Sequence, residues 1–233
     1  MPIHTVFDLL AWGGGGLLGL AVRRCWLAGA ATPDPIRHPW WYASAILGAV
    51  AGAVALGTLN IHLAGLPGMG KSVVGALAGA IAAVEAYKHF TGLSGSTGLG
   101  VVAPLAFGIA VGRIGCLLSG LEDFTYGTPT ALPWGMDFGD GIARHPVQLY
   151  ESLAMAAFLV WFLAALALGH EMPRRHGFAL LVAVYAGQRF CWEFLKPYPD
   201  VIGPFNLFHL TCLGLLAYGL VMIRRRRDRH AHA

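Results

Sequence analysis

The sequence predicts an all-α protein that crosses a membrane several times. Hydrophobic residues make up 56% of the 233 residues and charged residues only 12%, about half the charged share of a typical soluble domain. The mean hydropathy is +0.61. Apolar residues continue through long stretches instead of alternating with polar ones, which indicates membrane helices and not barrel strands. We therefore expect about seven transmembrane helices in one bundle.

The helices are expected where an apolar stretch approaches the length of a bilayer core, which is about 20 residues. There are seven such stretches: residues 5–22, 40–63, 73–87, 101–119, 147–168, 178–194 and 207–223. The third stretch is short unless its flanks contribute. Arg23 and Arg24 directly follow the first stretch, so we interpret it as a retained helix and not as a signal peptide. Glycine pairs in the second and third stretches, Gly48 with Gly52 and Gly75 with Gly79, predict close helix contact.

The chain is predicted to form one domain over residues 1–233, without internal repeats. Its longest connection, residues 120–144, is expected to be an outer loop that rests on the membrane interface through Trp134 and Phe138. A basic tail, residues 224–233, follows the last helix and is expected to contact anionic lipid.

Basic residues predict the orientation. If seven helices alternate, eleven basic residues lie on one side and only Lys71, Arg144 and Lys196 lie in loops on the other. The eleven are Arg23, Arg24, Arg37, Lys88, Arg174, Arg175, Arg224, Arg225, Arg226, Arg227 and Arg229. The positive-inside rule then places the amino terminus outside and the carboxyl terminus in the cytoplasm. The net charge of +4 is mainly a topological signal, and no nucleic-acid partner is expected.

The four cysteines show no paired spacing, so neither a disulfide framework nor a metal site is predicted. Residues 65–72, Gly-Leu-Pro-Gly-Met-Gly-Lys-Ser, match a phosphate-binding loop. That motif requires a preceding strand, whereas a membrane helix precedes it here, so we favour a glycine-rich turn without ATP. Lys71, Ser72 and the first N–H groups of the third helix are candidates for holding a lipid phosphate.

Charged residues gather near the outer ends of three helices. Arg113 lies near the end of the fourth, Arg144 to Glu151 open the fifth, and Gln188, Arg189, Glu193 and Lys196 lie at the end of the sixth. A charge in hydrocarbon costs about 2.5–3.5 kcal/mol. One interpretation is that these charges pair and lock the bundle. The other is a site for an anionic phosphate, because Arg113, Arg144 and Arg189 outnumber Glu151 and Glu193.

The polar motifs resemble those of the bacterial prolipoprotein diacylglyceryl transferase family. They are Gly112-Arg113-Ile114-Gly115, Ser119-Gly120, Tyr126-Gly127, Arg144-His145-Pro146-Val147-Gln148-Leu149-Tyr150-Glu151, and Arg189-Phe190 with Glu193-Phe194. The resemblance implies seven helices in the bacterial plasma membrane. It also implies transfer of the diacylglyceryl group of phosphatidylglycerol to the lipobox cysteine of a secreted precursor, without metal or cofactor.

The resemblance also implies roles for individual residues. Arg113 and Arg189 match the family arginines and are expected to bind the phosphate and stabilise the leaving group. Glu151 completes the catalytic set with His145. Substrate contacts are expected from Gln148, Tyr150, Gly127 and Glu193 in the matching motifs, and, apart from the resemblance, from Lys71 and Ser72 in the glycine-rich segment. This chain departs from the family where Val74 replaces a histidine and Cys116 and Ser119 replace asparagines.

Several alternatives stay open at the level of the sequence. His145 is a plausible base for the thiol because histidine side chains commonly act as general bases, but it is equally compatible with a simple role at the start of a helix. The arginine field alone could also form the thiolate. A non-catalytic or altered-substrate relative that binds anionic phospholipid is the alternative function. A transporter is less favoured, because the charges cluster at one surface and no inverted repeat is evident.

Overall fold

The structure is a computed structural model that describes the backbone of residues 2–28, 33 and 35–231, with side chains at 3–28, 33 and 35–224. Its seven long helices are α1 (Pro2–Cys25), α2 (Pro39–Leu63), α3 (Val73–Thr91), α4 (Val102–Leu118), α5 (Val147–Ala167), α6 (Glu171–Glu193) and α7 (Leu207–Ala231). The all-α prediction is confirmed. The third helix reaches 19 residues by including its flank, whereas α6 and α7 extend beyond their apolar stretches into charged sequence. The side chains of the predicted basic tail after Arg224 lie outside the described residues.

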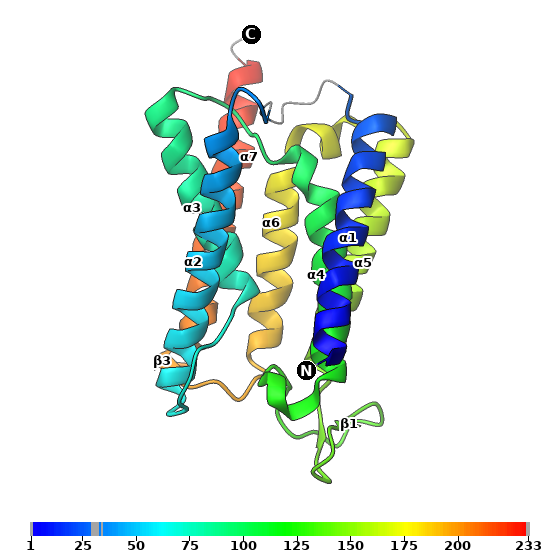
Figure 1. The fold of residues 1–233 in the computed structure, drawn as a ribbon, viewed down its shortest axis with the longest axis vertical. Helices are drawn as coiled ribbons and strands as arrows, with labels where there is room; N and C mark the ends of the chain where they lie inside the picture. Colours follow the sequence, from blue (N-terminus) through cyan, green and yellow to red (C-terminus); the bar gives the residue numbers. More distant parts are fainter. Residues whose placement is uncertain (1, 29–32, 34, 232–233) are drawn as a thin grey trace.

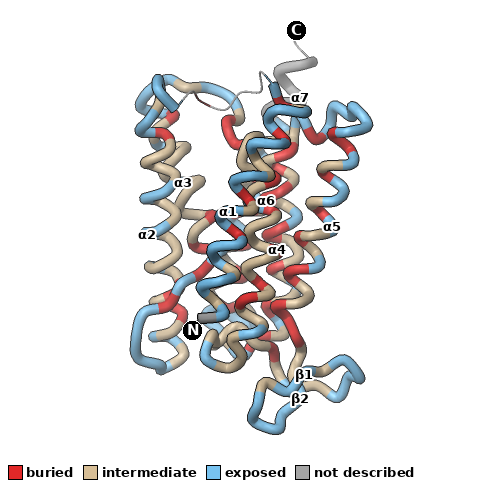
Figure 2. The backbone as a smooth tube through the Cα atoms, turned by 45° about the vertical axis from the view of Figure 1, so that its right-hand side comes forward, coloured by how far each residue is buried: buried red, intermediate tan, exposed pale blue. Residues whose placement is uncertain are grey.

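Six of the helices are long and apolar enough to cross a membrane, which makes the chain a multi-pass membrane protein. The exception is α6, whose ends carry charged residues. It lies in the centre of the bundle, between the α2–α3 pair and the group formed by α1, α4 and α5 (Figure 1). Buried positions concentrate on α4, α5 and α6, as Figure 2 shows. The polar residues of α6 therefore face other helices.

Each helix packs against at least one other helix of the bundle. The main pairs are α2 with α3, α1 with α4, α4 with α5, α5 with α6, and α6 with α7. The amino and carboxyl termini lie at opposite ends of the bundle (Figure 1). We call the end that holds the amino terminus the outer end, and the opposite end the inner end.

Glycines allow α2 and α3 to approach closely. A side chain at Gly52 or Gly48 would clash with the carbonyl oxygen of Gly75 or Gly79, respectively, on the facing helix, and the reverse also holds. The predicted small-residue contact is confirmed. It brings the two backbones together without a hydrophobic side chain between them.

The connection between α2 and α3 folds back along α2. The backbone N–H of Ser72 donates to the carbonyl oxygen of Ala53 at 3.1 Å, ten residues before the end of α2, which corresponds to about 15 Å. The Ser72 hydroxyl caps α3 by accepting from the N–H of Gly75 at 3.1 Å. Helices therefore flank residues 64–72 on both sides, which contradicts a nucleotide-binding loop and agrees with the predicted turn.

Short elements shape the remaining connections: the 3₁₀ turns η1 (Leu99–Val101) and η2 (Gly120–Asp123), and the antiparallel pairs β1 (Met136–Asp137) with β2 (Ala143–Arg144) and β3 (Asp200–Ile202) with β4 (Phe205–Asn206). The β1–β2 hairpin lies in the long outer loop and is mostly exposed (Figure 2). Trp134 ties this loop to the bundle, because its indole Nε1–H donates to the Tyr150 hydroxyl at 2.9 Å.

Candidate functional site

Three cations surround one carboxylate near the outer end of the bundle. Glu151, in the first turns of α5, is fully buried. Its Oε2 lies 2.5 Å from Nε of Arg113 on α4, and its Oε1 contacts Nη1 of Arg189 on α6. The same Oε1 lies 2.9 Å from Nζ of Lys196, which follows α6. Glu151 therefore joins α4, α5 and the end of α6.

A second carboxylate extends this arrangement to α7. Nε of Arg189 lies 2.8 Å from Oε2 of Glu193, one helical turn along α6. The amide of Asn206 donates to Oε1 of Glu193 at 3.2 Å, and its own oxygen accepts the N–H groups of Phe208 and His209 at the start of α7. Arg189 and Glu193 therefore pair along one face of α6. We call Arg113, Glu151, Arg189, Glu193 and Lys196 the ion cluster.

Helix geometry brings the cluster to one depth. Arg113 lies five residues before the end of α4, Glu151 four after the start of α5, and Arg189 four before the end of α6. At the rise of an α-helix these offsets correspond to about 6–8 Å. Antiparallel neighbours with matched offsets place their side chains at a common level, as the sequence predicts.

The ion cluster has a surplus positive charge and is shielded from solvent. Two carboxylates face two guanidinium groups and one ammonium group, and no member exposes more than 6% of its side chain. Burial lowers the pKa of Lys196 to about 8, although Glu151 and Glu193 favour its charged form. An uncompensated buried charge is costly, so a protonated Lys196 leaves the cluster suited to one additional anionic group.

Unpartnered polar groups lie beside the ion cluster. The amide of Gln148, the amide of Gln188 and the hydroxyl of Tyr185 are buried without hydrogen-bond partners in the described part of the chain. Tyr185 lies one turn before Arg189, and Gln148 one turn before Glu151, so they share helix faces with the cluster. Buried polar groups are nearly always hydrogen-bonded. These atoms therefore favour a ligand or bound water.

Arg144 lies outside the ion cluster, contrary to the prediction that it contributes to the charge surplus. Its Nη1 and Nη2 bind the two oxygens of Asp140 at 2.6 and 2.7 Å within the outer-loop hairpin. This pairing holds the pKa of Asp140 below its usual range. Lys196 supplies the third cation instead. The outer loop neutralises Arg144 locally, which the sequence spacing alone did not reveal.

His145 and Tyr150 lie together at the edge of the site. Nδ1 of His145 is 3.5 Å from the Tyr150 hydroxyl, and the Tyr150 ring packs against Trp192 with centroids 5.2 Å apart. Gly127 supports this region: its N–H donates to the His145 carbonyl at 3.1 Å. A Cβ at Gly127 would lie 2.7 Å from the His145 Cβ, so close packing explains the glycine.

The sequence places Lys196 among the charged residues at the end of the sixth helix without assigning it a role in the site, and it does not single out Tyr185 or Asn206. Tyr185 is detectable in principle from its i−4 spacing to Arg189 on a helix face. Lys196 and Asn206 lie beyond the end of α6, where helical periodicity gives no information. Their approach to Glu151 and Glu193 depends on the path of the connection to α7.

Comparison with known proteins supports the motif assignment. A family model described as prolipoprotein diacylglyceryl transferase matches residues 34–225. The chain belongs to this family. No solved structure matches.

Curated relatives match about half of this chain. Proteins named phosphatidylglycerol–prolipoprotein diacylglyceryl transferase from Geobacter sulfurreducens and Nitratidesulfovibrio vulgaris are 35% and 34% identical to this one over 139 and 141 residues. These matches cover 54% and 57% of this chain and 51% and 52% of those proteins. A relative of the same name from Bordetella parapertussis is 37% identical over 131 residues, which cover 52% of this chain and 42% of that protein. The chain thus spans about half the length of these diacylglyceryl transferases.

Proposed function

We propose that this protein transfers the diacylglyceryl group of phosphatidylglycerol to the thiol of a lipobox cysteine in a secreted lipoprotein precursor. The proposed location is the bacterial plasma membrane. The observation that carries the proposal is the meeting of Arg113 and Arg189 at the buried Glu151, with Lys196 adding a surplus positive charge. Family membership and the names of the relatives support the same reaction.

The charge of the ion cluster fits the proposed lipid. A phosphodiester carries one negative charge, which balances the single positive surplus. The cluster contacts use Nε of Arg113, and Nε and Nη1 of Arg189. Each guanidinium has five N–H donors in a planar fork, so both retain donors for phosphate oxygens. Arginine is suited to this role because it binds phosphate through two parallel, charge-assisted bonds.

The proposed reaction is a displacement at carbon. The thiolate sulfur attacks the glyceryl carbon that bears the phosphate, so a carbon–sulfur bond forms while the carbon–oxygen bond breaks. The electron pair stays on the departing glycerol phosphate, which gains a second negative charge. Arg113 and Arg189 stabilise that developing charge from fixed positions.

The thiol proton requires an acceptor. We propose that His145 takes it, because Nδ1 faces the Tyr150 hydroxyl and leaves Nε2 for a substrate proton. The competing route is formation of the thiolate by the positive field of the ion cluster. We further propose that Gln148 contacts substrate oxygens through its unpartnered amide, with Tyr150, Gly127, Glu193, Lys71 and Ser72 shaping or supporting the substrate path.

We also propose that the outer end faces away from the cytoplasm, which supports delivery of a secreted precursor to the ion cluster. The eleven-to-three distribution of basic residues supports this orientation. Reporter fusions after Arg229 should report the cytoplasm, and fusions within residues 127–133 should report the exterior. The reverse pattern would place the arginines in the wrong leaflet and overturn the site proposal.

The deciding experiment measures transfer from phosphatidylglycerol to a lipobox peptide in proteoliposomes. Arg113→Lys and Arg189→Lys keep the charge but lose the planar fork, so each should lower kcat by about 10²-fold or more. The double variant should lose less than the sum of the two effects, because both groups hold one leaving group. Arg174→Lys is the matched control, since Arg174 donates to the Trp26 carbonyl at the inner end.

Two outcomes would contradict the proposal in different ways. An active wild type with unimpaired single variants would reduce both arginines to charges that lock the bundle. A folded wild type that binds phosphatidylglycerol but transfers nothing would favour a non-catalytic lipid-binding protein.

A further inference from the structure

A second group of polar side chains meets where the start of α1, the end of α4 and η2 come together. Nε2 of His4 lies 3.7 Å from Sγ of Cys116 and 3.5 Å from Oδ1 of Asp123. One ligand atom from each residue lies within 4.8 Å of the other two. His4 and Cys116 are 112 positions apart, so only the packing of α1 against α4 brings these groups together (Figure 1).

Neighbouring side chains orient these three groups toward one another. Nδ1 of His4 lies 2.9 Å from Oδ2 of Asp8, which leaves Nε2 facing Cys116 and Asp123. Oδ2 of Asp123 accepts from the Thr125 hydroxyl at 2.6 Å, which leaves Oδ1 facing His4. Metal-binding histidines commonly donate their second ring N–H to a carboxylate in this way.

The backbone also holds the group in place. Gly115 allows the approach of α1, because a Cβ there would lie 2.7 Å from the Cβ of Phe7. Phe124, directly after Asp123, is the only non-glycine residue with a positive φ in the described chain, at 50°. Its carbonyl accepts from the Tyr198 hydroxyl at 2.8 Å. The turn after Asp123 is therefore held by tertiary contacts, and a strained residue needs such support.

We propose that His4, Cys116 and Asp123 bind one zinc ion at the outer end of the bundle, with Asp8 orienting His4. Tetrahedral zinc with nitrogen, sulfur and oxygen ligands separates its ligand atoms by about 3.3–3.6 Å, close to the 3.5 and 3.7 Å found here. The mixed ligand set suits zinc and not magnesium or calcium, which prefer oxygen ligands alone. The fourth position is open to water.

The site is accessible and electrically compatible with its surroundings. The side chains of His4 and Asp123 are 33% and 19% exposed, so an ion can enter from the aqueous phase. On binding, Cys116 releases its thiol proton to solvent and coordinates as a thiolate. The divalent ion, the thiolate and the carboxylate then sum to zero charge. The positive surplus of the ion cluster is preserved, although Nη1 of Arg113 lies 3.8 Å from the Cys116 sulfur.

A bound ion would link the amino-terminal turn of α1 to the end of α4 and the start of the outer loop. The zinc proposal does not rest on the proposed transfer reaction, and its test does not measure transfer. The sequence did not suggest it, because the cysteine spacing contains no metal motif and the three ligands come from separate segments.

The first test is cobalt titration of the full-length protein, purified in detergent and treated with a chelator. Co²⁺ replaces zinc in such sites, and a cysteine ligand produces a thiolate-to-cobalt charge-transfer band. We expect one equivalent to produce this band and excess Zn²⁺ to remove it. Cys116→Ser should abolish the band, whereas the controls Cys25→Ser and Cys191→Ser, at exposed cysteines, should retain it. An unchanged band in Cys116→Ser, or none in the wild type at excess cobalt, would overturn the proposal.

A second variant keeps the proposal testable if Cys116→Ser does not fold. Asp8→Asn retains all three ligands but weakens the orientation of His4, and it should lower metal affinity about 10–100-fold. In the wild-type protein, Zn²⁺ should also protect Cys116 from alkylation while Cys25 reacts as before, as measured by peptide mass spectrometry. Equal alkylation of Cys116 with and without Zn²⁺ would contradict metal binding there.

Discussion

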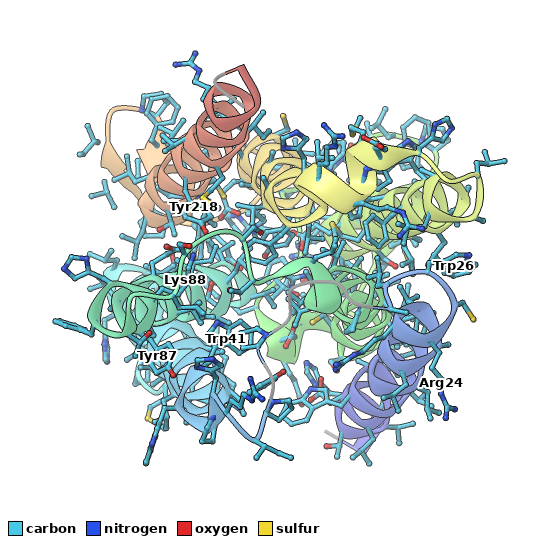
Figure 3. The ribbon with its side chains drawn as sticks, turned by 90° about the horizontal axis from the view of Figure 1, so that it is seen from above. Arg24, Trp26, Trp41, Tyr87, Lys88 and Tyr218 are labelled. Carbon is cyan, nitrogen blue, oxygen red and sulfur yellow. The ribbon has the colours of Figure 1, made fainter. Side chains whose placement is uncertain are left out.

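The polar groups at the two ends of the bundle are arranged differently. At the inner end, Lys88 on α3 lies 2.8 Å from Glu85, and the Tyr218 hydroxyl of α7 donates to the same carboxylate at 2.9 Å. Trp41 similarly donates to Thr97 at 3.1 Å. Figure 3, viewed from this end, shows Lys88 and Tyr218 on facing helices. One cation meets one carboxylate, and Glu85 is 39% exposed.

In the ion cluster at the outer end, charge is neither balanced nor exposed. Glu151 contacts Arg113, Arg189 and Lys196, and it is fully buried. Uncharged polar atoms beside it lack partners in the described chain. The inner arrangement is sufficient to link two helices. The outer arrangement carries more charge than helix association requires, and this excess supports the proposed binding of an anionic group.

The largest effect is expected from Glu151→Gln compared with Glu85→Gln. Loss of the Glu151 carboxylate leaves three buried cations with only Glu193 to balance them. We expect a loss of about 3–5 kcal/mol in the free energy of unfolding, typical of a broken buried ion pair, together with loss of transfer. Glu85→Gln should cost at most about 1 kcal/mol, because that pair is partly solvated. Unfolding in detergent measures both; equal losses would remove the distinction between the two ends.

Histidine–tyrosine pairs at the two ends provide the next comparison. Nδ1 of His145 is 3.5 Å from the Tyr150 hydroxyl, and Nδ1 of His38 is 3.3 Å from the Tyr87 hydroxyl. If His145 is the base, His145→Gln should lower kcat about 10²–10⁴-fold. His38→Gln should leave kcat unchanged. A normal rate in His145→Gln would instead support thiolate formation by the positive field.

A smaller effect is expected from the titration of Lys196, which faces Glu151, Glu193, Arg113 and Arg189. Burial lowers its pKa to about 8, whereas an unfolded lysine titrates near about 10.4. Above pH 8 the folded protein therefore loses this proton before the unfolded chain does. The Lys196 contribution to stability should rise with pH in this window, while affinity for phosphatidylglycerol should fall as the surplus charge disappears.

Lys196→Arg separates this effect from general alkaline changes. Arginine stays charged throughout the window, so its lipid affinity should not fall above pH 8. Lys88→Arg at the inner end is the control and should retain the wild-type profile. Lipid affinity should be measured from pH 7 to 10, about three pH units around the pKa of Lys196. An equal decline of affinity in the wild type and in Lys196→Arg would contradict the assignment.

The smallest effect is expected at residues 65–72. Lys71→Ala should leave nucleotide binding at background, because helices and not a strand precede and follow this segment. Equilibrium binding of a labelled ATP analogue checks the prediction. Saturable binding that Lys71→Ala abolishes would show that the segment is a functional phosphate loop.

The sequence by itself determined where the helices lie and which charged residues share one depth in the bundle. Hydrocarbon requires backbone groups to be satisfied within each crossing segment, so long apolar runs predict helices whatever their neighbours are. The four-residue spacing of Gly48 with Gly52 and Gly75 with Gly79 likewise predicted a close contact. The common depth of Arg113, Glu151 and Arg189 followed from their similar distances to helix ends.

Only the tertiary structure decided which charged groups meet. The sequence favoured Arg144 as the third cation, but the hairpin pairs it with Asp140, and the connection after α6 brings Lys196 to Glu151 instead. The group formed by His4, Cys116 and Asp123 likewise depends on how α1 packs against α4. Side chains pair only when the tertiary structure brings them within a few ångströms of each other. Helical periodicity specifies only which residues are neighbours within one helix. The paths of the loops between helices therefore determined which charged groups meet, which residue spacing alone did not specify.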